Sequence, residues 1–172
     1  MPKSLADGKK KFTVLDGAPA DVNAVTVVEA TAGVDYSCAV LSSDFDLGFD
    51  ASDRVQEKGL CAKGNAEALG ASNVSGGFTV FREFIVGTGL PDPVALAEQL
   101  WALVKEKGGT LHILLRHSGK DSAEVWGAGD EYVYIEWSND VPQKSNMDGY
   151  IKHRVEGAAQ RFSDGYQVLV AA

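Results

Sequence analysis

The sequence predicts a mainly β fold, an antiparallel β-sandwich or barrel with one flanking α-helix and one long loop. About seven or eight short segments are rich in β-branched and aromatic residues and are separated by turn formers. Only residues 93–107 show the 3.6-residue apolar repeat of an amphipathic helix, and such a helix must pack on a sheet. Residues 42–73 show neither pattern. We therefore expect one domain at 12–172, preceded by a short arm at 1–11.

The first strands have the weakest patterns. Residues 12–15 and 22–31 carry β-branched side chains and are separated by the turn formers at 16–17, which predicts two strands. Residues 36–41 form a third candidate strand, although apolar and polar residues alternate poorly there.

The later elements have clearer patterns. Residues 76–86 predict a strand with large side chains on both faces, and Asp92, Pro93 and Gly108 provide the N-cap, first turn and end of the helix at 93–107. The apolar face of that helix consists of Leu96, Leu100, Leu103 and Val104. The remaining expected strands are 110–116, 132–137, 150–155 and 166–170.

The long loop at 42–73 is unusual for a domain of this size. It contains six acidic and three basic residues, several glycines, and one possible strand near 54–60. Connections longer than about 15 residues are generally either functional or disordered. Phenylalanine and leucine residues are spread from Phe45 to Leu69, so we expect the loop to become ordered against another surface.

The charge distribution excludes one class of function. The formal net charge is −8 and the isoelectric point about 4.8, which argues against static binding of nucleic acid through phosphate neutralisation. The first eleven residues carry a charge of +3, because four lysines outnumber Asp7, and the remainder carries −11. The chain thus begins with a basic arm on an acidic body.

Targeting and cysteine patterns are both weak. No apolar run approaches the roughly 18 residues of a membrane span, and the N-terminus lacks the apolar stretch of a signal peptide, so we expect synthesis in a cytosol. Cys38 and Cys61 form no metal or redox motif and are interpreted as reduced thiols that are buried or half-buried.

The sequence contains few catalytic candidates. It has no phosphate-binding or dinucleotide-binding glycine loop and no nucleophile elbow. His112 and His117 are separated by an odd number of residues on one strand, and His153 lies between two basic residues, so no metal or cofactor is expected. Solvated loop charge is the favoured interpretation of the carboxylate pairs, which are Asp44 with Asp46 and Asp130 with Glu131.

One group of short segments resembles a known family. The segments are FDLGFDASD at 45–53, EKGLC at 57–61, GNA at 64–66, GASN at 70–73, FTVFR at 78–82, KEKGGT at 105–110, the Pro142 loop and GYIK at 149–152. Together they resemble the major tail tube proteins of long-tailed bacteriophages (siphoviruses), above all those that infect actinobacteria. The resemblance covers roughly residues 12–170. The turn at 87–91 departs from it, because a more acidic turn is expected there.

This resemblance implies a structural virion protein rather than an enzyme, without a cofactor. Such proteins are β-sandwiches that form hexameric rings, stacked into a hollow tube. Strands of neighbouring subunits would pair into a continuous inner barrel, which removes unpaired strand edges. Double-stranded DNA carries a charge every ~1.7 Å and would pass an acidic wall without tight binding. The implied partners are further copies of the chain and the tape measure, tail tip and tail terminator proteins, with no membrane.

The resemblance also suggests roles for individual residues. The long loop would reach an adjacent ring or subunit through Asp44, Phe45, Asp46, Leu47, Phe49, Asp50, Asp53, Leu60 and Leu69. The candidate lumen residues are Glu131, Glu136 and Glu156, for which the outer surface is an equal alternative. Lys9, Lys10 and Lys11 of the basic arm would contact an acidic neighbour, with a frayed tail as the alternative.

Two other functions stay open at this point. A tail terminator or a head-tail connector would form a single ring and never polymerise. A ligand-binding β-barrel, or an enzyme that uses Asp44, Asp46 or His112, would be a closed monomer with a deep apolar pocket.

Overall fold

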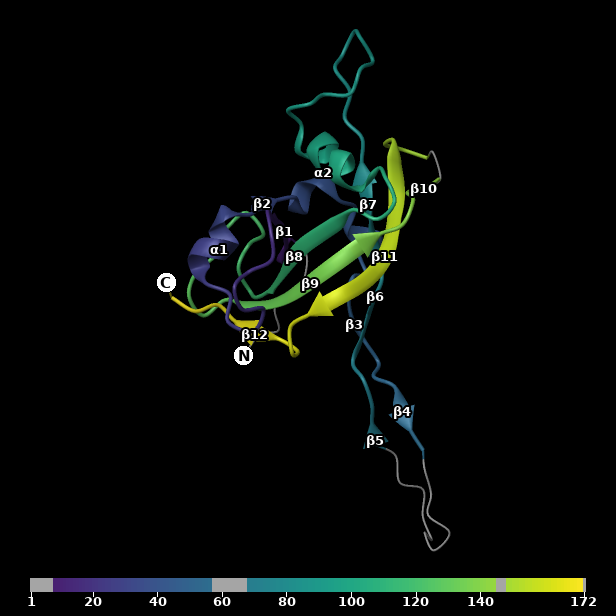
Figure 1. Ribbon diagram of the computed structural model, residues 1–172. Helices are drawn as coiled ribbons and strands as arrows, with labels where there is room; N and C mark the ends of the chain where they lie inside the picture. The colour runs from purple at the N-terminus through teal and green to yellow at the C-terminus, as the bar shows by residue number, and fades with distance from the viewer. Residues whose placement is uncertain (1–7, 57–67, 145–147, 172) are drawn as a thin grey trace, which may run out of the picture.

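A large antiparallel sheet organises the fold (Figure 1). The computed structural model describes residues 8–56, 68–144 and 148–171, and it is mainly β with a curled sheet and few helices. The strand order is β10-β11-β9-β8-β1-β2, with β12 beside β9 and β7 beside β11. The bounds are β1 Lys10–Leu15, β2 Val34–Asp35, β7 Gly77–Phe81, β8 Thr110–His117, β9 Glu131–Asn139, β10 Gln143–Lys144, β11 Lys152–Phe162 and β12 Gln167–Val168.

Strand β11 joins two parts of this sheet. Its first half pairs with β7, where Val155 lies opposite Phe78, and with β10 on the other edge. Its second half pairs with β9, where Ala158 lies opposite Ser138. A register shift between Ala159 and Arg161 marks a β-bulge, which bends a strand and increases its twist.

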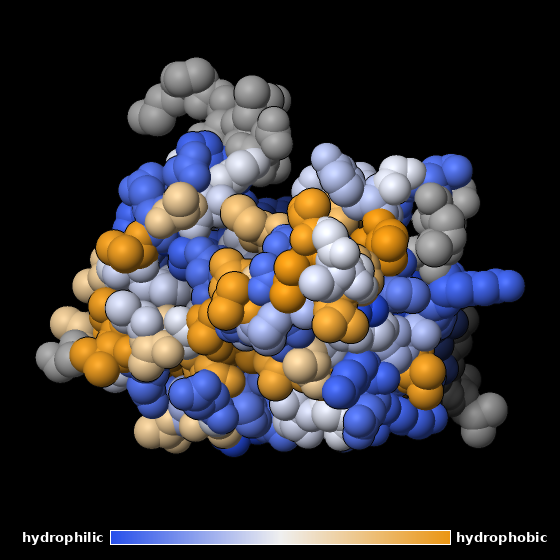
Figure 2. All heavy atoms as spheres, turned by 90° about the horizontal axis from the view of Figure 1, so that it is seen from above, coloured by the Kyte–Doolittle hydropathy of each residue, from blue (hydrophilic) through white to orange (hydrophobic). Residues whose placement is uncertain are grey.

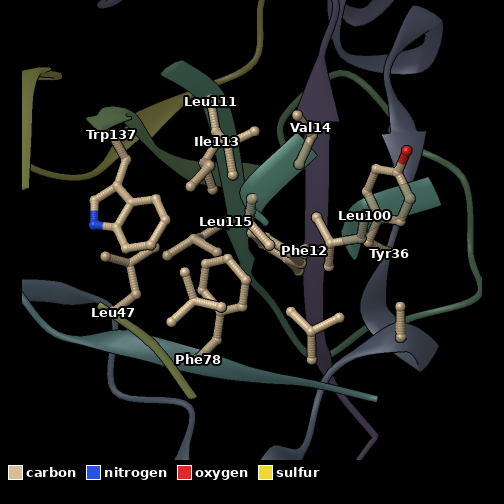
Figure 3. Close-up of a cluster of buried hydrophobic side chains, with 14 of the residues drawn as sticks. Phe12, Val14, Tyr36, Leu47, Phe78, Leu100, Leu111, Ile113, Leu115 and Trp137 are labelled. Atoms are coloured by element: carbon tan, nitrogen blue, oxygen red, sulfur yellow. The ribbon is translucent and has the colours of Figure 1, made fainter. Parts of the chain in front are cut away.

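The face of the sheet toward helix α2 (Leu96–Val104) covers the larger core. Because side chains alternate along a strand, every second residue of β1, β8 and β9 points to this face. Figure 3 shows these side chains meeting Phe78 of β7 and Leu47. The labelled members are Phe12, Val14, Tyr36, Leu47, Phe78, Leu100, Leu111, Ile113, Leu115 and Trp137.

The opposite face of the sheet covers a smaller core at one end only. Leu114, Tyr132 and Tyr134 from the sheet pack there with Val25 and Trp126 from the flanking segments. The Tyr132 hydroxyl accepts from the Val25 N–H at 2.9 Å and donates to the Val22 carbonyl at 3.0 Å. These bonds attach the segment after β1 to the sheet without making it a strand.

Two of the expected strands are wrong. Residues 22–31 contain an irregular stretch followed by helix α1 (Val27–Ala32), because Thr26 and Glu29 form a capping box at its start. Within 36–41, residues Ser37–Ala39 form the 3-10 helix η1, followed by a second, η2, at Ser42–Asp44. The strand predicted at 76–86 ends at Phe81, and that at 150–155 is the longer strand β11.

Helix α2 is shorter than predicted at both ends, because it begins at Leu96 and ends at Val104 rather than at 107. The Asp92 carboxylate accepts from the Val94 N–H at 3.1 Å, so Asp92 stabilises a turn, and the N-cap residue is Ala95. Gly108 follows the helix with a φ of +86°, a conformation that favours glycine. The Asn139 amide of β9 donates to the carbonyls of Val104 and Glu106, which attaches the end of the helix to the sheet.

The long loop forms a two-stranded arm rather than an irregular excursion. Strand β3 (Gly48–Asp50) pairs with β6 (Asn73–Ser75), and β4 (Arg54–Val55) pairs with β5 (Ala68–Leu69). We call the described residues 48–56 and 68–75 the hairpin arm, and β4 with β5 its outer ladder. The arm extends away from the end of the sheet opposite α2 (Figure 1). Of the strand expected near 54–60, the described part is β4.

Candidate assembly surfaces

The segment that leads into the hairpin arm, residues 44–49, is attached to the core of its own chain, and we call it the arm root. Leu47 is only 5% exposed, and the Phe45 ring lies 5.6 Å from that of Phe12. The Phe49 ring lies 5.8 Å from the rings of Phe162 and Tyr166. Three apolar residues for which the resemblance implies contacts with a neighbouring subunit therefore have partners within the described chain.

Charged groups fix the direction of the arm root. The Asp46 carboxylate accepts from Arg154 at 2.6 Å and from the Gly77 N–H at 2.8 Å, while Asp44 accepts from Thr79 and lies 3.7 Å from Arg154. Burial would raise the pKa of Asp46, but the bonds from Arg154 and Gly77 outweigh it and hold this pKa below its usual range. Asp44 and Asp46 thus form a structural ion-pair cluster.

The outer ladder, unlike the arm root, has apolar side chains that are exposed to solvent. Leu69 is 79% exposed and Val55 is also exposed, so the described arm carries apolar side chains into solvent. Asp53 accepts from the Asn73 amide at 3.0 Å, and Asp50 accepts from the Ala51 N–H and the Ser75 hydroxyl, which lowers the pKa of Asp50. Leu60 lies outside the described residues.

The structure separates the three candidate lumen residues. Glu136 and Ser138 are two residues apart on β9, so their side chains share one face of the sheet. Ser138 lies opposite Ala158 of β11, and Glu156 is two residues before Ala158, so Glu156 shares this face. Glu131 is exposed on β9 at an odd separation from Glu136, and so its side chain belongs to the other face. The odd separation of Glu131 and Glu136 on one strand can be read from the sequence, whereas placing Glu156 on the face of Glu136 requires the pairing of β9 with β11.

The part of the sheet around Glu136 is uncovered and polar. We call it the open face, and it consists of Thr110, His112, Glu136, Ser138, Glu156, Ala158 and Arg161, all exposed or half-buried. Burial and the nearby Glu136 carboxylate raise the pKa of Tyr134 to about 12, so its hydroxyl keeps its proton 2.9 Å from His112 Nδ1. His112 is therefore a structural hydrogen-bonding residue on this face.

The three lysines expected in the basic arm lie at the start of the sheet. Lys10 and Lys11 belong to β1, so the described body begins before residue 12. Lys11 is 6% exposed and pairs with Asp35, Lys10 lies 5.8 Å from the centre of the Phe45 ring, and Lys9 lies 3.9 Å from Asp121. All three thus have partners within the chain. Residues 1–7 lie outside the described residues.

One surface was not identified from the sequence. The loop between β7 and α2 exposes Ile85, Val86, Leu90 and Val94. Where this loop starts, the Arg82 N–H donates to the Ile151 carbonyl at 2.9 Å, and Tyr150 and Ile151 before β11 are exposed too. Figure 2 shows hydrophobic side chains gathered at this end of the molecule. We call these six exposed residues, with Leu96 and Leu103 on the exposed side of α2, the apolar pole. The loop members are branched apolar residues without a helical period. Leu96 and Leu103 were expected on the apolar face of the helix, but only Leu100 and Val104 of that face are buried.

Other features offer little for catalysis. Among the described residues, no three His, Cys, Asp or Glu side chains gather as they would around a metal ion. A cavity of about 350 Å³ lies between β1 and the arm root, lined by Phe12, Phe45, Lys10 and His117 among others. Cys38 is exposed rather than buried as expected, and Cys61 lies outside the described residues.

Comparisons with known proteins identify the family. None of the helices in the described ranges is long and apolar enough to cross a membrane. No curated protein matches the chain. A family model described as "Phage tail tube protein" matches residues 1–172, the whole length. The protein is therefore a structural component of the virion and not an enzyme. The chain belongs to the phage tail tube protein family.

Proposed function

We propose that this chain forms hexameric rings, that the rings stack into the tail tube, and that double-stranded DNA passes through a bore lined by the open face. A siphovirus tail is the proposed setting, with the tape measure protein inside the tube and the tail tip and terminator proteins at its ends. The observation that carries the proposal is on β11, where an uncovered polar face coincides with an unpaired edge.

The edge consists of the second half of β11. Beyond Glu156, no strand of the described chain forms a hydrogen-bonded ladder with the side of β11 that faces away from β9; β6 lies near β11 without pairing with it. The Asp140 N–H donates to the Glu156 carbonyl at 2.7 Å, so Gly157 and, two residues later, Ala159 turn their backbone groups outward. An open edge of this kind pairs readily with another strand. A strand from the neighbouring subunit would close the ring.

The open face supports the role of a DNA conduit. Glu136 and Glu156 are the carboxylates on it, and Arg161 is its guanidinium. Arg154 borders the face 3.7 Å from Glu156, but it is shared with Asp44 and Asp46, so carboxylates remain in excess. A basic wall would bind DNA by releasing counterions, whereas a wall with excess carboxylates leaves the polyanion free to slide. The chain carries a net charge of −8, so the assembled rings would supply a negative field around the bore.

Ring closure can be tested by removing one outward donor. Ala159→Pro deletes the outward N–H of β11, while Ala158→Ser on the same strand keeps all backbone donors and serves as the matched control. In negative-stain micrographs of purified full-length protein, we expect six-fold rings and tubes from the control and dispersed subunits from Ala159→Pro. Circular dichroism checks that both variants are folded. Normal rings from folded Ala159→Pro would contradict closure at this edge.

The lining of the bore can be tested by charge reversal. Tubes with Glu136→Lys and Glu156→Lys should retain double-stranded DNA in a salt-dependent manner, because each lysine adds a phosphate contact. Glu131→Lys, on the other face of β9, is the control and should leave the tubes free of DNA. Retention by the control alone would place the opposite face at the bore. Six-fold rings that never stack would instead favour a terminator or connector.

A further inference from the structure

We propose that the apolar pole is the docking surface for the outer ladder of the hairpin arm of the next copy along the tube. Leu69 and Val55 of the arm would lie against Val86, Leu90 and Tyr150 of the neighbour. The inference rests on the proposed stacking of rings and adds the surface that receives the arm.

The pole is a rigid platform with exposed apolar side chains. Within its loop, the Ile85 N–H donates to the Leu90 carbonyl at 2.8 Å, and Phe84 forms a bridge with Pro91. Val86 at the tip is 99% exposed. These exposed side chains bury no apolar surface in the isolated chain. Exposed apolar patches of this kind mark interaction sites.

A buried ion pair anchors this platform to the body. Arg82 donates two hydrogen bonds to Glu98 of α2, at 2.7 and 3.0 Å, and its guanidinium lies 4.5 Å from the centre of the Trp101 ring. Glu98 also accepts from the Glu83 N–H at 2.9 Å. Burial would raise the pKa of Glu98, but these bonds outweigh it and lower this pKa. The loop thus leaves β7 in a fixed direction.

The pole also contains a shallow hollow for a side chain. It has a volume of about 230 Å³ and is lined by Phe81, Arg82, Glu83 and Tyr150. The Tyr150 ring packs edge-on against Phe81, at 6.0 Å between centres, and is otherwise 79% exposed. A branched aliphatic side chain such as that of Leu69 would pack against the two aromatic rings of this hollow, because burial removes apolar surface of both partners from water.

The positions of the arm and the apolar pole indicate that a second copy of the chain binds the pole. The arm leaves the end of the sheet opposite the end that bears α2 and the pole (Figure 1). When identical subunits repeat along an axis, the contact is heterologous and joins opposite ends of the molecule. Each copy has one arm and one pole. Every copy can therefore bind two neighbours along the tube, except for the copies at its two ends.

A disulfide test addresses the contact directly. The parent carries Cys38→Ser and Cys61→Ser, and the test variant adds Leu69→Cys and Val86→Cys. Oxidised tubes of this variant should give a ladder of covalent multimers on non-reducing gels, since a disulfide forms only when Cα atoms approach within about 7 Å. Variants with one added cysteine, and a control pair of Leu69→Cys with Val168→Cys on β12, should give no such ladder.

The outcomes separate the inference from the proposed function. Tubes without a ladder in the test variant overturn docking of the arm on the pole but leave ring stacking intact. A parent that never forms tubes overturns the proposed function, and the inference with it. A ladder from the control pair equal to that of the test pair overturns the docking, since the contact is then nonspecific.

A second measurement needs no cysteines. Val86→Ser with Leu90→Ser should raise the critical concentration for tube assembly by roughly tenfold or more, because two apolar contacts are lost for each subunit. Val125→Ser, a change at another exposed valine outside the pole, is the control and should leave this concentration unchanged. Equal critical concentrations for the pole variant and the control would overturn the proposal.

Discussion

The root and the outer ladder of the hairpin arm are neighbours in sequence but differ in environment. The root has a buried leucine, aromatic contacts with the core and an ion-pair cluster around Arg154. The outer ladder has exposed side chains that include Val55 and Leu69. The comparison indicates that the root contributes to the stability of the monomer, whereas the outer ladder is available for assembly.

Leu47→Ala should give the largest effect on stability. The side chain is 5% exposed within the larger core, and removing a buried leucine costs about 2–5 kcal/mol. The free energy of unfolding, from urea denaturation of unassembled protein, measures this loss. A change below about 0.5 kcal/mol would show that the root does not contribute to the monomer core.

Arg154→Met should have an intermediate effect. It removes the hydrogen bonds to Asp46 and to the Asp44 carbonyl, and bonds of charged groups contribute about 1–3 kcal/mol each. The matched control is Arg161→Met on the same strand, an exposed side chain on the open face, for which we expect a change within about 0.5 kcal/mol. Equal losses in the two variants would argue against a special role for the cluster.

The pH dependence of the Asp46 contribution should be smaller still. Its pKa is lowered in the folded state, so its stabilisation is complete above the unfolded pKa of about 4 and is lost as pH falls through the folded value. The difference in urea midpoint between wild type and Asp46→Asn should therefore shrink from pH 7 to pH 3. A constant difference would mean that the charge of Asp46 contributes nothing.

Leu69→Ala should have the smallest effect on folding, with a change within about 0.5 kcal/mol. Because its side chain is mostly in solvent, truncation leaves the monomer unaffected while it weakens assembly. Urea denaturation and sedimentation of tubes measure the two effects on one sample. A loss of stability comparable to that of Leu47→Ala would remove the distinction between root and outer ladder.

The sequence predicted the parts of the fold in which apolar residues follow a clear helix or strand pattern. Residues 93–107 gave the position of α2, and β-branched and aromatic runs gave β8 and β9. The run at 22–31 misled because its valines favour strand, although Thr26 and Glu29 at capping-box spacing indicated the start of a helix. Tertiary bonds from Tyr132 determine the path of the preceding residues, and no local pattern encodes them.

The assembly surfaces were less predictable, for physical reasons. The absence of a strand or helix pattern at 42–73 identified the long loop as a distinct element, but composition does not reveal that Phe45 and Phe49 pack on their own chain. Grouping Glu136 with Glu156 requires the register between β9 and β11, in which Ser138 lies opposite Ala158. The apolar pole is formed by a loop and by residues before β11, about 60 positions apart in the chain, which only folding brings together.

The most direct test is a cryo-electron microscopy map of tubes assembled from the purified full-length chain. The account predicts six subunits in each ring, a neighbouring strand hydrogen-bonded to the outer edge of β11 at Gly157 and Ala159, and Glu136 and Glu156 facing the bore. A map in which this edge is solvent-exposed and both glutamates lie on the outside of the tube would contradict it.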